Sequence, residues 1–195
     1  MEEKIKIIIG QLGSLRIKEN VDLDEYILSK PGTKAAALFI ATSTTELVKA
    51  VSLCRELKIP FLLIGSGSKL SIKVIFFQGL VIKNRCHNLK IFGVKGKVSR
   101  SGIGVKEAFI EADSGTTLSD LAAFSLKQDL SGFEDLFKQI GTVGGSILNN
   151  ILLRDRTVHI NILDNSGDNK MRDLDKLHGN DVVLKAIFHL KAKEV

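Results

Sequence analysis

The clearest structural signal in this chain is the stretch Ile59-Pro60-Phe61-Leu62-Leu63-Ile64-Gly65-Ser66-Gly67-Ser68-Lys69-Leu70. Its apolar run stops abruptly at two glycines and two serines, which is typical of a buried strand that ends in a tight loop. The glycines let backbone amides approach a ligand, while the serines and Lys69 add hydroxyl donors and positive charge. Such a nest of N–H groups suits a pyrophosphate, although a lone loop of this kind is more often only a tight turn.

The residues before this loop predict a strand, a helix and a second strand. Residues 35–41 are small and apolar, as in a buried strand. The segment Ser43-Thr44-Thr45-Glu46 reads as a capping box, in which the Ser43 hydroxyl accepts from the Glu46 amide. Apolar residues then recur at helical spacing as far as Leu57. Strand, helix, strand and glycine loop together indicate a parallel βαβ unit.

The second half of the chain has a different sequence pattern, in which short strand-like segments are separated by glycines or short turns. We expect antiparallel hairpins there, followed by a helix from Thr116–Thr117 and a short helix near 133–139. The expected strands span residues 79–82, 89–94, 97–103, 107–112, 158–163 and 182–190. The predicted fold class is α+β, with a small N-terminal βαβ lobe at about 20–84 and a larger mixed-sheet lobe at about 85–195.

Two further glycine segments lie in the second lobe. Gly141-Thr142-Val143-Gly144-Gly145 leads into a helical start at Ser146, where a helix dipole favours an anion. Ser114-Gly115-Thr116-Thr117 is a third candidate turn. Neither the first loop nor the Gly141–Gly145 loop matches the Walker A or Gly-x-Gly-x-x-Gly pattern. From the residues alone the chain is a nucleotide-phosphate binder, or its glycines serve only as turns.

The amino-acid composition limits the kinds of binding partner that we expect. The chain has 195 residues, 28 Lys and Arg against 22 Asp and Glu, 44% hydrophobic residues and 6% aromatic residues. The net charge of +6 suits an anionic partner, but the basic residues are spread along the chain, so we expect no nucleic acid. No leader sequence or membrane-spanning stretch is expected, and two cysteines without metal-ligand spacing predict a metal-free cytoplasmic protein.

Read together, the segments resemble a known family. Residues 59–70, Gly79-Leu80-Val81-Ile82, Leu130-Ser131-Gly132-Phe133-Glu134 and Ile140–Ser146, followed by Asn149, occur in the order and spacing of one cofactor domain. It is the FAD-binding domain of the UDP-N-acetylenolpyruvoylglucosamine reductase (MurB) family. That domain is of the p-cresol methylhydroxylase/vanillyl-alcohol oxidase (PCMH) type. The resemblance covers roughly residues 20 to 192.

The resemblance implies that a single domain, 1–195, holds FAD noncovalently between its two lobes. It implies that NADPH reduces the flavin, which reduces an enolpyruvyl UDP-sugar for peptidoglycan synthesis. Arg172, in Met171-Arg172-Asp173-Leu174, is the residue left of a catalytic Tyr-Arg-x-Ser motif. The implied cofactor-binding residues are Gly65, Ser66, Gly67, Ser68, Lys69, Leu70, Gly115, Thr116, Ile140, Gly141, Thr142, Gly144, Gly145, Ser146 and Asn149. We also expect the space beside Gly144 to admit the cofactor.

Departures from the family pattern leave alternatives open. Lys69 stands where the family usually has Asn, and Gln139-Ile140 stands where it has Ile-Pro. We expect no counterpart of the family's C-terminal substrate domain, which supplies the proton-donating serine. The chain is therefore a divergent FAD-dependent reductase, an FAD- or nucleotide-binding module that needs a separate substrate-domain partner, or a degenerate domain that has lost FAD.

Overall fold

The structure is a computed structural model that describes residues 2–27, 32–68, 74–99 and 102–193. The chain divides into two compact units, Met1–Cys86 and His87–Val195.

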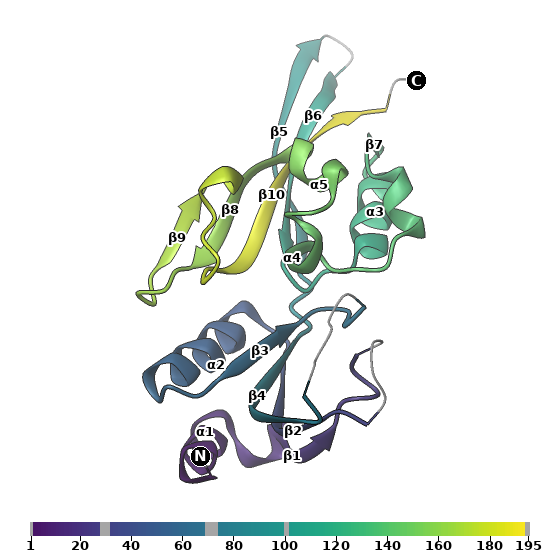
Figure 1. Ribbon diagram of the computed structural model, residues 1–195. Coiled ribbons are helices and arrows are strands. Elements are labelled where there is room, and N and C mark those ends of the chain that lie inside the picture. The colour runs from purple at the N-terminus through teal and green to yellow at the C-terminus, as the bar shows by residue number, and fades with distance from the viewer. Residues whose placement is uncertain (1, 28–31, 69–73, 100–101, 194–195) are drawn as a thin grey trace. The chain divides into compact units, whose positions relative to one another are not determined.

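The first unit is built on a four-stranded sheet in the order β1-β2-β4-β3 (Figure 1). Strands β2, β4 and β3 are parallel, and β1 pairs antiparallel with β2. The expected parallel unit is present, and β4 lies between the two strands that the βαβ pattern predicts. The elements of this unit are α1 (Glu2–Leu12), a 3₁₀ turn (Ser14–Arg16), β1 (Ile17–Asp22), β2 (Lys34–Ala41), α2 (Thr44–Glu56), β3 (Phe61–Ile64) and β4 (Phe76–Asn84).

Helix α2 begins as its sequence predicts. Ser43 is the N-cap, and its hydroxyl accepts a hydrogen bond from the Glu46 amide at 3.2 Å. The apolar face of α2, which includes Cys54, is fully buried. A separate apolar cluster joins Tyr26 and Ile27, which precede β2, to Ile64 and Val81 on the sheet. The first glycine loop follows β3 directly beside this second cluster.

The second unit contains a six-stranded sheet in the order β5-β6-β10-β8-β9, with β7 also paired to β10. Its described strand pairs are all antiparallel. The mixed sheet therefore lies in the first unit and not, as expected, in the second. The elements are β5 (Leu89–Ser99), β6 (Gly102–Asp113), α3 (Leu118–Lys127), β7 (Leu130–Ser131), a 3₁₀ turn (Glu134–Lys138), α4 (Val143–Ser146), α5 (Ile151–Arg156), β8 (Thr157–Leu163), β9 (Asn169–Arg172), a 3₁₀ turn (Leu174–Lys176) and β10 (Val182–Ala192).

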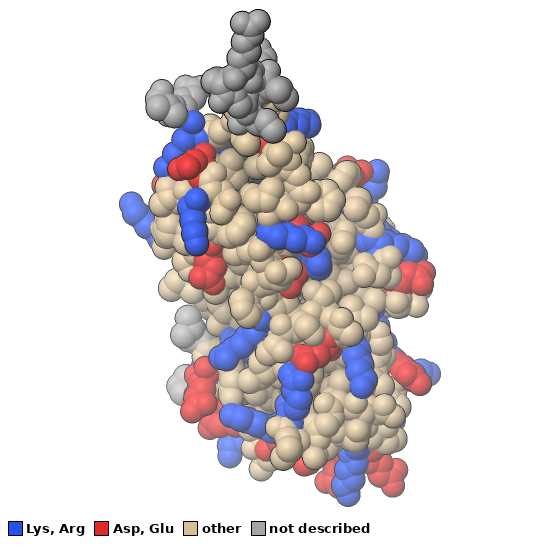
Figure 2. Space-filling model, turned by 180° about the vertical axis from the view of Figure 1, so that it is seen from behind, with Lys and Arg blue, Asp and Glu red and all other residues tan. Residues whose placement is uncertain are grey.

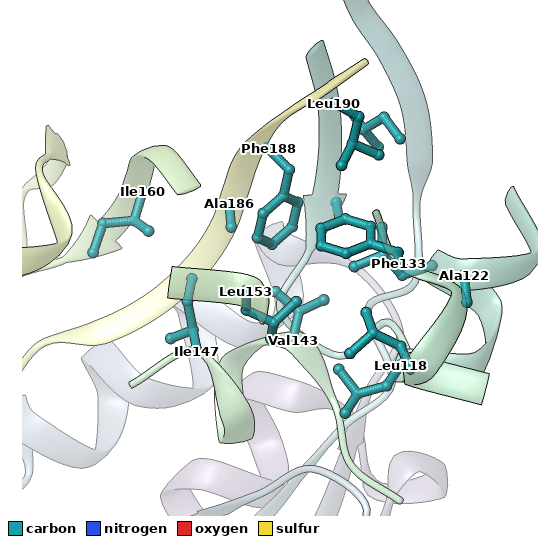
Figure 3. Close-up of a cluster of buried hydrophobic side chains, with 14 of the residues drawn as sticks. Leu118, Ala122, Phe133, Val143, Ile147, Leu153, Ile160, Ala186, Phe188 and Leu190 are labelled. Carbon is teal, nitrogen blue, oxygen red and sulfur yellow. The ribbon is translucent and has the colours of Figure 1, made fainter. Parts of the chain in front are cut away.

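A single apolar core joins this sheet to its short helices (Figure 3). The rings of Phe133 and Phe188 meet edge to face, with centroids 5.3 Å apart. Leu118 at the start of α3 and Val143 at the start of α4 belong to the same core. Two of the candidate cofactor loops are therefore anchored at one end by buried side chains.

Several elements differ from the sequence-based expectations. The pieces expected at 89–94, 97–103 and 107–112 form two long strands, β5 and β6. Helix α4 begins at Val143 and includes Gly144 and Gly145, so the glycine run is itself helical and does not merely lead to a helix at Ser146. Helices α1 and α5 and strand β1 were not expected.

The surface shows no concentration of one charge on the face drawn in Figure 2, where Lys and Arg side chains are interspersed with Asp and Glu. Within the described ranges, no helix is long and apolar enough to cross a membrane.

Candidate functional site: three glycine loops in two units

The first loop, Gly65–Ser68, lies at the carboxyl end of β3. In parallel sheets this is the edge at which ligands usually bind. Gly67 has φ +81°, and a Cβ added there would overlap the carbonyl oxygen of Tyr26 and lie 3.0 Å from Ile27 Cα. Only glycine fits this position, because both the backbone conformation and the packing exclude a side chain. Lys69 and Leu70, also expected to bind the cofactor, lie outside the described residues.

The two serines of this loop face one another. Their hydroxyl oxygens are 2.8 Å apart, and the Ser68 amide donates to Ser66 Oγ at 3.4 Å. Both side chains are half-buried. Each hydroxyl keeps further hydrogen-bonding capacity after this mutual bond, because a hydroxyl has one donor and two acceptor sites.

The second and third loops are brought together in the other unit. The Val143 amide donates to the Thr116 carbonyl at 2.9 Å, and the Gly144 amide donates to the Ser114 carbonyl at 2.8 Å. An antiparallel bridge pairs Thr117 with Thr142. The sequence identified both loops as candidates, and the structure joins them through backbone hydrogen bonds.

This arrangement corrects one expectation. The amides of Val143 and Gly144 donate to backbone carbonyls of the neighbouring loop, so they are not free to bind a phosphate. A Cβ at Gly144 would lie 2.9 Å from Ser114 Cβ, so the space into which a side chain would project at this glycine is filled by protein. The absence of a side chain at Gly144 allows the two loops to pack closely against each other.

Two buried hydroxyls beside this contact lack partners. Thr116 is fully buried and Ser146 is 1% exposed, and neither hydroxyl oxygen has a hydrogen-bond partner among the described residues. A buried polar group without a partner costs about 1–3 kcal/mol, so such atoms are uncommon unless they serve a ligand or an ordered water. These hydroxyls fit a ligand rich in hydrogen-bonding groups, such as the FAD that the sequence implies.

The other residues expected to bind the cofactor fall into a buried group and an exposed group. Gly115, Gly141 and Thr142 are buried. Ile140 is 69% exposed, and Gly145 and Asn149 are also exposed. A Cβ at Gly145 would meet only Thr142 Oγ1, at 3.3 Å. This segment is therefore exposed at Ile140, Gly145 and Asn149, whereas Gly144 packs against Ser114.

Arg172 is not brought to these loops. It ends β9 and lies in register with Ile160 of β8, Ala186 of β10 and Ala112 of β6. At about 4.8 Å per strand, this row places Arg172 roughly 14 Å from Ala112, which lies just before the third loop. Its guanidinium binds Asp181 at 3.1 Å. The catalytic role implied for Arg172 stays a prediction.

Lys83 is a candidate that the sequence reasoning missed. It lies next to last in β4, and only 9% of it is exposed. Burial and the like charge of Arg85 lower the pKa of its ammonium group. The sequence signal was a lone lysine directly after the apolar run Leu80–Ile82. Its burial follows from the pairing of the strands and could not be read from that run.

The chain matches a known protein family over most of its length. The model of the FAD binding domain family matches residues 35–165. The UDP-N-acetylenolpyruvoylglucosamine reductase of Clostridium botulinum (strain Alaska E43 / Type E3) is 33% identical over 135 residues, which are 69% of this chain and 40% of that protein. The reductase of Lactobacillus acidophilus is 29% identical over 191 residues, covering 90% of this chain and 59% of that protein. The chain thus spans about half the length of these relatives.

Solved structures show the same fold. The UDP-N-acetylenolpyruvylglucosamine reductase (MurB) of Thermus caldophilus superposes with a TM-score of 0.65 at 18% identity, covering 91% of this chain and 64% of that one. Substrate-bound p-cresol methylhydroxylase gives a TM-score of 0.63 at 14% identity, covering 98% of this chain and 43% of that one. The expected α+β fold of the PCMH type is confirmed. By its sequence match and its fold, the chain belongs to the family of FAD binding domains.

Proposed function

We propose that the two units together form one domain that binds FAD noncovalently and serves in the reduction of a UDP-sugar, as in UDP-N-acetylenolpyruvoylglucosamine reductases. The observation that carries this proposal is the pair of unpartnered buried hydroxyls, Thr116 Oγ1 and Ser146 Oγ, on loops joined by backbone hydrogen bonds. The family match supports the choice of FAD over other nucleotides.

In this proposal each loop has a distinct task. Gly65–Ser68 binds the pyrophosphate, because it combines a close-packed glycine with two adjacent hydroxyls. Thr116 and Ser146 hydrogen-bond the cofactor and fix its position on the joined loops. Bound FAD supplies hydride transfer, and the protein orients it. The segment around Ile140, Gly145 and Asn149 is exposed next to these buried residues.

The reducing nucleotide and the substrate belong to the same proposal. The relatives named as UDP-N-acetylenolpyruvoylglucosamine reductases suggest a UDP-sugar as substrate. NADPH as the electron donor and the cytoplasm as the location belong to the proposal through the sequence resemblance alone. These relatives contain sequence that the chain does not match. We therefore propose that turnover needs a substrate-binding part, supplied by a longer form of this chain or by a separate subunit.

The visible spectrum of the purified chain tests the proposal. Absorbance bands near ~375 and ~450 nm, present at once or after adding FAD and removing the excess, are expected of a bound oxidised flavin. A folded chain that stays colourless after incubation with FAD contradicts the proposal. Anaerobic addition of NADPH then separates a reductase, whose flavin bleaches, from a binding module, whose flavin does not.

A further inference from the structure

Lys83 occupies a position in the first unit's sheet where an apolar residue is expected. Its Cα pairs with that of Ile40 on β2 and with that of Ile64 on β3. Residues paired in this way across parallel strands point to the same face of a sheet. Ile64 belongs to the apolar cluster that Tyr26 and Ile27 cover, so the row Ile40–Lys83–Ile64 places a cation on a buried face.

The ammonium group of Lys83 is poorly compensated. Its hydrogen bond to the Tyr26 carbonyl is long, at 3.4 Å, and no Asp or Glu within the described ranges forms an ion pair with it. Its charged neighbour is Arg85, which repels it. A buried charge is costly unless a partner of opposite charge offsets the loss of water. The site therefore lacks a negative group.

The first glycine loop lies directly beside this cation. The Tyr26 carbonyl that accepts from Lys83 is the same one that packs against Gly67. Ile64, the strand neighbour of Lys83, is followed directly by Gly65. Lys83 and the loop Gly65–Ser68 thus share one carboxyl edge of the parallel strands, on one side of the sheet.

We propose that Lys83 provides the positive charge that binds the pyrophosphate of the cofactor at the Gly65–Ser68 loop. This inference rests on the proposed function, because FAD is the pyrophosphate ligand that the chain is proposed to hold. An anion bound at the loop gives the ammonium group the negative partner that the fold omits. A charge-assisted hydrogen bond to phosphate is stronger than the long bond to a carbonyl.

The test compares two lysines at opposite ends of the same strands. The variants are Lys83→Met, Lys83→Arg and, as a matched control, Lys34→Met. Lys34 is exposed and pairs with Phe76 at the start of β4, so its substitution removes the same charge far from the loop. Dissociation constants for FAD and for ADP, which contain the same pyrophosphate, are measured by titration. Chemical denaturation without ligand checks that each variant folds.

Lys83→Met should weaken binding of FAD and of ADP by similar factors of roughly 10 to 100, as expected for loss of a hydrogen bond to a charged group. Lys83→Arg should keep most of the affinity, and Lys34→Met should bind both ligands like the unchanged chain. The unliganded Lys83→Met variant should be at least as stable as the unchanged chain, because it removes a buried unpaired charge.

The inference is overturned if Lys83→Met binds FAD and ADP as tightly as Lys34→Met does. It is also overturned if Lys83→Met lowers the stability of the unliganded chain as well as its affinity for the ligands. If the unchanged chain binds ADP but not FAD, the proposed function fails, and the ADP titrations alone decide the role of Lys83. If it binds neither ligand, both proposals fail.

Discussion

The amide of Gly144 donates a hydrogen bond to the carbonyl oxygen of Ser114 at 2.8 Å, and a Cβ on Gly144 would lie 2.9 Å from Ser114 Cβ. This contact joins two loops that are far apart in the sequence. It makes one hydrogen-bonded unit from two segments that, taken singly, would be ordinary turns.

Substitution of Gly144 should therefore lower the stability of the protein even when no ligand is present. Gly144→Ala forces apart two loops at a close contact, whereas Gly145→Ala adds a methyl group to an exposed position of the same short helix. Because both changes make the same Gly-to-Ala replacement, the difference between them isolates the contact. We expect Gly144→Ala to be less stable than Gly145→Ala by about 1–3 kcal/mol in urea denaturation. Equal stabilities would contradict the importance of the contact.

Removal of the unpartnered hydroxyls of Thr116 and Ser146 should lower the affinity for FAD without lowering the stability of the unliganded protein. Thr116→Val and Ser146→Ala remove a buried polar atom with little change in shape, so the unliganded protein should be as stable as before or more stable. The affinity for FAD should fall by roughly 5- to 10-fold for each variant, because one hydrogen bond to the ligand is lost. Thermal unfolding and FAD titration of the same samples give the two readouts. A stability loss with unchanged affinity would assign these hydroxyls to the fold alone.

The Arg16–Glu46 ion pair predicts an acid-sensitive step in the stability of the first unit. Arg16 Nη2 donates to Glu46 Oε2 at 3.0 Å, and the Thr42 amide donates to the same oxygen at 2.9 Å. The hydrogen bond from Arg16 is the main cause that lowers the pKa of Glu46 from 4.5 to about 2. The folded state therefore binds this proton more weakly than the unfolded state. The stabilisation is complete above pH 4.5 and is lost as the pH falls to about 2.

The matched variant for this pair is Glu46→Gln. Its stability, measured by denaturation from pH 6 to pH 2, should fall less steeply than that of the unchanged protein below about pH 4.5. Parallel curves for the two proteins over that range would show that the pair contributes nothing measurable, as exposed ion pairs often do.

Arg172 has a structural partner that allows its two possible roles to be separated. Asp181 is nearly buried, and its carboxylate also accepts from the His178 amide at 2.9 Å. Arg172→Ala leaves this carboxylate without its cation, so we expect a loss of about 1–3 kcal/mol in stability. Arg154→Ala, at an exposed position, should change stability by less than about 0.5 kcal/mol.

The catalytic prediction for Arg172 needs a second variant. Asp181→Asn weakens the ion pair but keeps the arginine. If Arg172→Ala and Asp181→Asn lower turnover to the same extent in an assembly that contains the substrate-binding part, Arg172 acts only through the fold. A turnover loss specific to Arg172→Ala would support contact with the substrate.

Local signals were the ones that could be predicted from sequence. The Ser43 cap of α2 depends on residues within one turn and was predicted correctly. Helix α3 begins after Thr117, close to the expected residue, for the same reason. Helix α1 had a usable signal in Ile5 and Ile8, which lie three residues apart on its buried side.

Long-range features could not be read in the same way. The bridge between Thr117 and Thr142 and the burial of Lys83 both depend on which segments meet in the folded chain. The glycines of the second loop show the difficulty most clearly. Their clustering made the segment a candidate, but only the structure shows that Gly144 contacts Ser114 while Gly145 is exposed.

Binding of FAD by this chain can be measured by a fluorescence titration of FAD into the folded, flavin-free chain. We expect saturable binding of one FAD for each chain, competed by ADP. Absence of saturable binding by a chain whose folding is verified in the same buffer would contradict this expectation.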